Sequence, residues 1–159
     1  LVVELQELLA KATDFCKKLA YLSGRKRYMK ILIADDDFTS RILLQGFLQT
    51  YGECTVCTDG LQAVNAFRSA FEEGSPFTLV CLDIMMPELD GQAALKKIRD
   101  IEEERGIAAR DGVKIIMTTA LDDKKNIISA FREQCDVYLV KPIDKEKLVE
   151  SLNTLNLID

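Results

Sequence analysis

The strongest constraint on the fold is a regular alternation between short apolar runs of β type and stretches with helical spacing. The alternation begins near residue 30 and runs through five β-α pairs. Such a pattern implies a parallel sheet with helices on both faces and right-handed crossovers. We therefore predict an α/β protein with a doubly wound, five-stranded parallel sheet. The predicted strands are residues 31–34, 54–57, 78–82, 113–117 and 137–140, and the predicted helices are residues 38–51, 61–71, 92–104, 123–134 and 144–155.

Turn and cap residues separate these segments at the expected places. Gly52 follows the first of these helical stretches as a C-terminal stop, and Asp144 stands where the last helix needs an N-cap. Pro87 and the Asp90-Gly91 pair mark the loop that follows the central strand, residues 78–82. All the predicted strands are apolar on both faces, as a sheet covered by helices on each side requires.

The N-terminal segment has a different pattern and is predicted to be an extra amphipathic helix. Its apolar residues alternate at spacings of four and three, which is a heptad seam. A polar, basic linker at residues 23–28 separates this segment from the rest. We therefore divide the chain into an N-terminal helix and basic linker, residues 1–28, and a main domain, residues 29–159. The seam consists of Leu1, Leu5, Leu8, Ala12, Phe15, Leu19 and Leu22.

This seam has two interpretations, packing on its own domain or self-association. The polar linker favours self-association, so we expect a homodimer formed through residues 1–22. The chain begins without methionine, and Met29 would make a plausible native start. Whether residues 1–28 are native to the protein therefore stays open.

Composition excludes several classes of function. The net charge of −5 argues against nucleic acid as a partner. No apolar run approaches the ~18 residues of a membrane span, and no signal peptide is apparent. The odd count of five cysteines, with Cys81 inside an apolar run, indicates reduced thiols and a cytoplasmic protein. Because no membrane span is predicted, we expect no membrane partner. Because the chain has no histidine, any phosphohistidine must come from another protein.

Cys54 and Cys57 form a C-x-x-C pair, which is a spacing found in redox and zinc sites. Here the pair lies in a strand-like stretch, where residues three apart point to opposite faces. No histidine and no second C-x-x-C is present to complete a zinc site. We interpret both cysteines as structural.

Polar residues follow four of the predicted strands, in the stretches ILIADDD, LVCLD, IIMTTA and VYLVKP. The carboxyl ends of parallel strands meet at one edge of the sheet, which is where ligands bind in open α/β folds. Clustered carboxylates repel one another and hold either a proton or a cation, and all-oxygen ligands favour Mg²⁺. We expect these residues to form one site: Asp35, Asp36, Asp83, Thr119 and Lys141.

The chemistry of this group fits phosphoryl transfer, which mainly requires positioning and neutralisation of charge. Mg²⁺, the Lys141 ammonium and the Thr119 hydroxyl would balance the charge of a phosphoryl group. Asp83 would then be the nucleophile and form an acyl phosphate.

The stretches ILIADDD, LDIMMPELDG, MTTA and VYLVKP together resemble the receiver domain of two-component response regulators, the CheY-like family with a flavodoxin-like fold. The resemblance covers residues 29 to about 156. It implies that Asp83 accepts a phosphoryl group from the phosphohistidine of a sensor histidine kinase or a phosphotransfer protein. The expected role is that of a phosphoacceptor that promotes its own phosphorylation, and not of an enzyme with a separate substrate.

The resemblance also implies a set of ligands. Asp36, Asp83 and the backbone carbonyl of Met85 would bind Mg²⁺ directly, and Asp35 would act through water. Lys141 would contact the phosphoryl group, with a cis peptide bond to Pro142.

A switch is implied as well. Thr119 and Tyr138 match the switch pair, in which the hydroxyl moves toward the new anion and the tyrosine turns inward. This change would alter the face formed by residues 123–155, where we expect a downstream protein effector to bind. Only a short tail follows residue 156, so we expect the output to be a protein contact.

Two positions depart from the polar residues often found in this family, Met85 and Leu121. Neither side chain can orient an attacking water molecule, so we predict slow self-dephosphorylation.

Three other functions are alternatives for a chain with this pattern. A phosphatase of the haloacid dehalogenase type would need a second aspartate where Met85 stands, and an FMN carrier would need a Gly-rich loop in place of DDDFTSR. The third alternative is a structural interaction module that works without phosphorylation. Such modules usually lose an acidic residue or the lysine, and neither is lost here.

Overall fold

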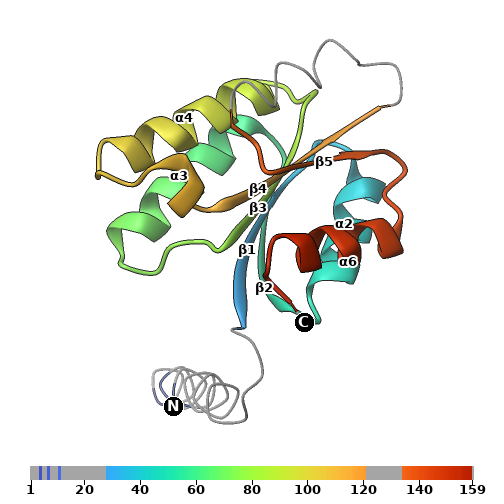
Figure 1. Cartoon of the computed structure of the whole chain (residues 1–159), viewed down its shortest axis with the longest axis horizontal. Helices are drawn as coiled ribbons and strands as arrows, with labels where there is room; N and C mark the ends of the chain where they lie inside the picture. The colour runs from blue at the N-terminus through green and yellow to red at the C-terminus, as the bar shows by residue number, and fades with distance from the viewer. Residues whose placement is uncertain (1–3, 5–6, 8–10, 12–27, 121–133, 159) are drawn as a thin grey trace.

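The computed structural model describes residues 4, 7, 11, 28–120 and 134–158. In this part of the chain, β strands and helices alternate in the predicted order (Figure 1). The elements are β1 (Met29–Ala34), α2 (Phe38–Leu48), β2 (Gly52–Cys57), α3 (Gly60–Glu72), β3 (Leu79–Asp83), α4 (Gly91–Glu103), a 3₁₀ turn η1 (Ala109–Asp111), β4 (Lys114–Thr119), β5 (Val137–Val140) and α6 (Lys145–Thr154).

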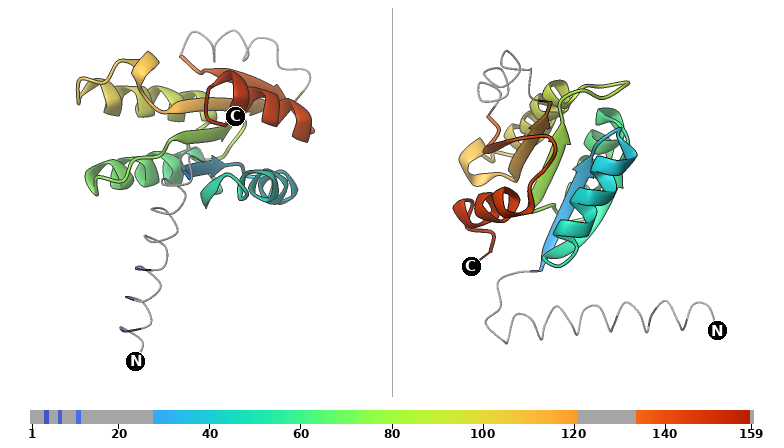
Figure 2. Two further views of the ribbon diagram at one scale, coloured as in Figure 1. Left: turned by 60° about the horizontal axis from the view of Figure 1, so that its bottom comes forward. Right: turned by 90° about the vertical axis from the view of Figure 1, so that its right-hand side faces the viewer.

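The five strands form one parallel sheet in the order β2-β1-β3-β4-β5. The predicted doubly wound α/β fold is therefore confirmed. Helices α3 and α4 cover one face of the sheet, and α2 and α6 cover the other (Figures 1 and 2). The predicted helix over residues 123–134 lies almost entirely outside the described residues, and so do all the seam positions of the predicted N-terminal helix.

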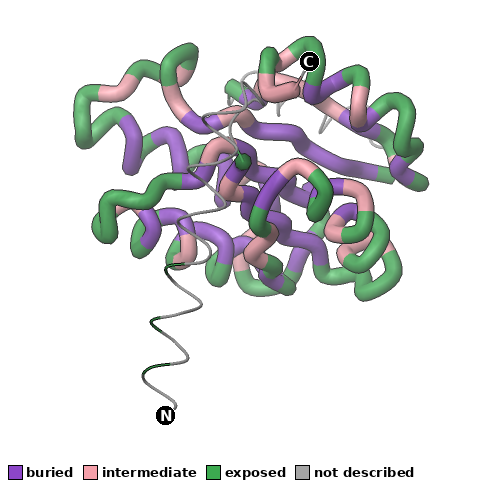
Figure 3. The backbone as a smooth tube through the Cα atoms, turned by 90° about the horizontal axis from the view of Figure 1, so that it is seen from below, coloured by how far each residue is buried: buried purple, intermediate pink, exposed green. Residues whose placement is uncertain are grey.

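Two hydrophobic cores lie between the sheet and the helices, one on each face of the sheet. One core joins Leu32, Val80 and Ile115 of the strands to α3 and α4, and the other joins Ile33, Cys81 and Ile116 to α2 and α6. The central strand β3 is buried along its whole length, as the tube in Figure 3 shows for the middle of the sheet. Adjacent residues of a strand thus enter opposite cores, which explains why the strands read as continuous apolar runs.

The same alternation confirms the expected orientation of the C-x-x-C pair. Cys57 belongs to the core beneath α3 and α4, whereas Cys54 packs against the core on the α2 and α6 side. Both thiols are free, and burial raises the pKa of Cys57 to about 11, with a smaller contribution from the charge of Asp59. A neutral thiol in a core is a structural residue, in agreement with the interpretation of the sequence.

Several boundaries differ from those predicted. Strand β4 runs to Thr119 and not to residue 117, because Thr118 pairs with Asp83 and Thr119 pairs with Val140. Helix α2 ends at Leu48 and not at residue 51, and Gly52 is the first residue of β2 and not a helix stop. A Cβ atom at Gly52 would collide with the carbonyl oxygen of Met29 in the adjacent strand, so the close pairing of β1 and β2 explains the glycine.

Aspartates cap the helices at the edge of the sheet where β1 and β3 end. The side chain of Asp144 accepts a hydrogen bond from the Lys147 amide at 3.0 Å, which confirms the predicted N-cap of α6. Asp37, Asp59 and Asp90 cap α2, α3 and α4 in the same way. Each such cap contributes about 1 kcal/mol and fixes where its helix begins. The loops at this edge are therefore held at their helical ends.

Candidate functional site

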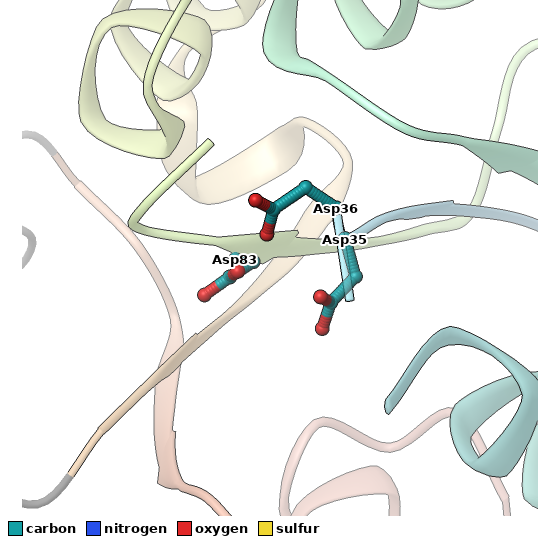
Figure 4. A group of neighbouring side chains, drawn as sticks. All are labelled: Asp35, Asp36 and Asp83. Carbon is teal, nitrogen blue, oxygen red and sulfur yellow. The ribbon is translucent and has the colours of Figure 1, made fainter. Parts of the chain in front are cut away.

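Three carboxylates meet at the carboxyl edge of the sheet. Asp35 follows β1 and is fully buried, Asp83 is the last residue of β3 and is 5% exposed, and Asp36 is exposed. Figure 4 shows the three side chains together, and their ligand oxygens all lie within 4.8 Å of one another. The sequence predicted this convergence from the positions of the residues at strand ends.

Lys141, which directly follows β5, forms ion pairs with two of these carboxylates. The Nζ atom of Lys141 lies 2.8 Å from Oδ2 of Asp35 and 3.2 Å from Oδ2 of Asp83. The backbone amide of Lys141 also donates to the Thr119 carbonyl at 2.6 Å, which extends the pairing of β4 and β5 by one step. The backbone thus aims the ammonium group at the carboxylates.

Burial and charge determine the protonation of these groups. Burial and the neighbouring charge of Asp35 raise the pKa of Asp83 to about 6, although the Lys141 ammonium opposes the rise. For Lys141, burial favours the neutral form, but the hydrogen bond to Asp35 and the charges of Asp83 and Asp35 outweigh it and raise the pKa. The lysine therefore stays charged at neutral pH, and Asp83 is ionised there but holds its proton more firmly than a free aspartate does.

These residues fit a small divalent cation. Three carboxylates and one ammonium leave an excess negative charge in a space where the carboxylate oxygens lie within 4.8 Å of one another. A hard cation of the Mg²⁺ type binds oxygen ligands and keeps some of its water, and the exposure of Asp36 leaves room for that water. The donor set and its spacing thus match the Mg²⁺ expected from the sequence.

Thr119 is the last residue of β4, and Tyr138 lies on the neighbouring strand β5. Thr119 is 1% exposed, and its hydroxyl oxygen has no hydrogen-bond partner among the described residues. Tyr138 pairs in register with Met117, so its side chain and that of Thr119 point to the same face of the sheet. Tyr138 is half-buried and packs against the core beneath α3 and α4. The two residues therefore share one face of the sheet on neighbouring strands.

Two further predictions concern residues near this edge. The peptide bond between Lys141 and Pro142 is cis, as the resemblance implied. Met85 follows β3 with a side chain that is 67% exposed, whereas Leu121 lies outside the described residues.

Residues that hold the acidic group in place were not apparent from the sequence alone. The guanidinium of Arg41 donates to the backbone carbonyl of Asp35 at 2.8 Å, one turn into α2. Gly91 donates to the Ile84 carbonyl at 2.8 Å, and a Cβ atom at Gly91 would collide with the carbonyl oxygen of Asp83. In the sequence the Asp90-Gly91 pair indicates a loop, and the glycine is also a signal of close backbone approach.

Comparison with known proteins agrees with this fold. A doubly wound five-stranded sheet in this order is the flavodoxin-like class. The family model of the response regulator receiver domain matches residues 31–153. The chain therefore belongs to the response regulator receiver domain family, the CheY-like domains of two-component signalling.

Two relatives indicate the range of proteins that contain this domain. The chemotaxis protein CheY of Bacillus subtilis is 34% identical over 130 residues, a match that covers 80% of this chain and 98% of CheY. Histidine kinase 3 of Arabidopsis thaliana is 31% identical over 139 residues, a match that covers 78% of this chain but only 13% of the kinase. The chain thus matches a whole protein in one case and a small part of a protein in the other.

Two solved structures illustrate the same domain with partners or ligands. One is a complex of a histidine phosphotransfer signalling protein from Saccharomyces cerevisiae with the receiver domain of its downstream response regulator. The matched chain is 27% identical to this one, with a TM-score of 0.68, and the match covers 80% of this chain and 88% of that chain. The other is the receiver domain of the histidine kinase CKI1 from Arabidopsis thaliana, complexed with Mg²⁺ and BeF₃⁻, at 25% identity, a TM-score of 0.64 and coverage of 81% and 89%.

In the part of the chain that the structure describes, no helix is both long enough and apolar enough to span a membrane.

Proposed function

We propose that this receiver domain accepts a phosphoryl group on Asp83 from the phosphohistidine of a sensor histidine kinase or a phosphotransfer protein. One observation carries the proposal: Lys141 lies within 3.2 Å of a carboxylate oxygen of Asp83 while also bound to Asp35. An ammonium held at that place is positioned to neutralise a phosphoryl oxygen beside the acceptor. The intact acidic group and lysine also count against a domain that works without phosphorylation.

The transfer is a substitution at phosphorus. An oxygen of the ionised Asp83 carboxylate attacks the phosphorus atom and forms a P–O bond, and the P–N bond to the partner's imidazole breaks. The bonding electron pair stays on the imidazole nitrogen, which then takes a proton from water. Because Lys141 is charged and the pKa of Asp83 is about 6, both groups are in the required state at neutral pH.

We assign the Mg²⁺ ligands as Asp36, Asp83 and the Met85 backbone carbonyl, with Asp35 acting through water. The ion would supply the positive charge that screens the attacking carboxylate from the phosphoryl oxygens. The spacing of the three carboxylates supports this assignment, and the related receiver of CKI1 was crystallised with Mg²⁺ and BeF₃⁻.

Acetyl phosphate with Mg²⁺ tests the acceptor directly. Mass spectrometry of the treated protein should show one phosphoryl adduct on the peptide that contains Asp83, and none after Asp83→Asn. Asp100→Asn, at an exposed position of α4, is the matched control and should be phosphorylated like the wild type. An adduct of equal yield in the Asp83→Asn protein would refute the assignment of Asp83 as the phosphoacceptor.

The phosphodonor protein is expected to dock on α2. This helix begins directly after Asp37, beside the acidic group, yet its Phe38, Ile42 and Leu43 side chains are 68%, 51% and 37% exposed. Exposed apolar side chains on a helix that begins next to the acidic group suit a helical partner that must bring its histidine to Asp83. Ile42→Glu should slow phosphotransfer from a phosphorylated histidine phosphotransfer protein and leave phosphorylation by acetyl phosphate unchanged. Equal slowing with both donors would refute this docking face.

Thr119 and Tyr138 form the proposed switch, with Thr119 acting on the phosphoryl group together with Lys141. The buried Thr119 hydroxyl, without a partner in the described structure, is free to bond a phosphoryl oxygen once one is present. The effector would read the change on the face formed by residues 123–155. Thr119→Val should still be phosphorylated, more slowly than the wild type because the hydroxyl no longer contacts the phosphoryl group, and should lose the difference in effector binding between the two states.

The remaining assignments follow the sequence. We propose a division into residues 1–28 and 29–159, a cytoplasmic location, and a homodimer formed through residues 1–22. Light scattering on the full chain and on a chain lacking residues 1–22, each with and without Mg²⁺ and beryllofluoride, tests the dimer. A doubled mass that requires residues 1–22 supports it, and a monomer under all conditions refutes it.

A further inference from the structure

The junction between β2 and α3 contributes no side chain to the acidic group. Its backbone nevertheless forms hydrogen bonds with the residue after β1 and with the loop after β3. The carbonyl of Cys57, the last residue of β2, accepts a hydrogen bond from the Asp35 amide at 3.2 Å. Three residues later, the amide of Gly60 donates to the Leu89 carbonyl at 3.1 Å. One short segment thus joins the residue after β1 to the loop after β3.

The Leu89 carbonyl lies in the loop that carries Met85. This loop, residues 84–90, is closed at its base by the bond from the Gly91 amide to the Ile84 carbonyl at 2.8 Å. Inside it, Glu88 adopts a φ of 62°, and the Leu89 amide bonds the Pro87 carbonyl at 2.7 Å. A left-handed residue and a tight turn leave the loop few ways to relax. A displacement of the Leu89 backbone would therefore also shift the backbone at Met85.

Gly60 is packed against this loop so closely that any side chain there would force the backbone to shift. A Cβ atom at Gly60 would overlap the carbonyl oxygen of Leu89 and lie 3.2 Å from that of Asp90. The junction itself is held in place: Asp59 is buried and accepts a hydrogen bond from the Gln62 amide at 2.8 Å, which fixes the start of α3. Any added methyl group would thus displace residues 89–90 and not the helix.

We propose that Gly60 is a positioning residue for the Mg²⁺ site, because it allows the Leu89 carbonyl to approach α3 and so sets the Met85 carbonyl at its ligand position. The proposal rests on the proposed function, since that function assigns the Met85 carbonyl to the ion. The coupling is reciprocal: an ion held by the loop also strengthens the bond between Gly60 and Leu89.

Gly60→Ala tests the proposal, and Gly52→Ala is its matched control. A Cβ at Gly52 would likewise collide with a backbone carbonyl, that of Met29, but at the opposite end of β2. Both variants should lose stability. Titration calorimetry with MgCl₂ should give a dissociation constant about tenfold or more above wild type for Gly60→Ala. For Gly52→Ala the constant should stay within about twofold, because distant sites act independently.

A measurement on the wild-type protein keeps the proposal testable if Gly60→Ala does not fold. Saturating Mg²⁺ should slow amide hydrogen exchange at Gly60, measured by NMR, several-fold more than at Met29, whose amide bonds the Tyr51 carbonyl at 3.0 Å at the opposite end of β1. Equal slowing at the two amides, or equal Mg²⁺ affinity in the two glycine variants, overturns the role of Gly60. A wild-type protein that binds no Mg²⁺ overturns the proposed metal site itself.

Discussion

Replacing Asp83 by asparagine should stabilise the metal-free protein at neutral pH. The pKa of Asp83 is raised from 3.8 to about 6, because burial and the charge of Asp35 disfavour its ionised form. The folded protein therefore binds this proton more tightly than the unfolded chain does. Stability contributed by the proton is fully present below about pH 4 and is lost as the pH rises through about 6.

The magnitude follows from the shift in pKa. Two units correspond to about 3 kcal/mol, at about 1.4 kcal/mol for each unit. The site opens to solvent on the side of Asp36, so screening reduces the effect, and about 1 to 2 kcal/mol is the expected gain. Lys141 keeps a partner in the variant, because its ion pair with Asp35 at 2.8 Å remains. The substitution thus removes a repulsion without leaving the ammonium group unpaired.

Urea unfolding in the presence of a metal chelator, followed by circular dichroism, measures this effect. Asp83→Asn should exceed the wild type in free energy of unfolding at about pH 7.5, and the difference should vanish at about pH 4. Asp100→Asn, an exposed substitution on α4, should stay within about 0.5 kcal/mol of wild type at both pH values. Mg²⁺ should stabilise the wild type more than Asp83→Asn. It should therefore reduce the difference in free energy of unfolding between the two proteins. A variant less stable than wild type at neutral pH in chelator would refute this electrostatic account.

Three other substitutions have equally definite outcomes. Glu102→Gln should lower the free energy of unfolding in urea by about 2 to 4 kcal/mol, because Glu102 is 1% exposed and accepts hydrogen bonds from Arg99 at 2.7 Å and from the Val113 amide at 2.6 Å. Glu103→Gln, at the neighbouring exposed position, is the control and should leave that free energy almost unchanged. Gly46→Ala should add about 0.5 to 1 kcal/mol, because Gly46 lies inside α2 with no atom near its missing Cβ, and a loss in the same experiment would contradict this. Met85→Asn should shorten the half-life of the phosphorylated protein several-fold, measured by loss of radiolabel from Asp83; an unchanged half-life would count against the predicted slow dephosphorylation.

The architecture was predictable because the information for it is local. Apolar runs of strand length and the alternation with helices give the sheet, and the residues after each strand give the acidic edge. Convergence of Asp35, Asp83 and Lys141 needed only the rule that parallel strands end at one edge. The end of β4 was not predictable in this way: threonine is favoured in strands but also in turns, and only the pairing with Asp83 and Val140 extends the strand to Thr119.

Interactions that depend on burial were not predictable. Arg99 and Glu102 are three residues apart, a spacing typical of a weak ion pair on the surface of a helix. In the structure both are buried, and Arg99 also bonds the Val113 and Gln134 carbonyls and the Asp136 carboxylate. This pair therefore ties the C-terminal half of α4 to the starts of β4 and β5. The raised pKa of Asp83 has the same origin, since it depends on which groups exclude water from the carboxylate.

The two Asp-Gly pairs show most clearly what tertiary structure adds. Asp59-Gly60 and Asp90-Gly91 are the same dipeptide, and each places a capping carboxylate before the first residue of a helix. Local chemistry explains the aspartates fully, because each satisfies an amide of the first turn. It does not explain the glycines, since many residues can begin a helix. Their reason is a backbone carbonyl pressed against each Cα atom, from Leu89 at Gly60 and from Asp83 at Gly91. The two glycines thus hold the loop of residues 84–90 from opposite ends, and substitutions there should act on the ion that this loop is proposed to bind.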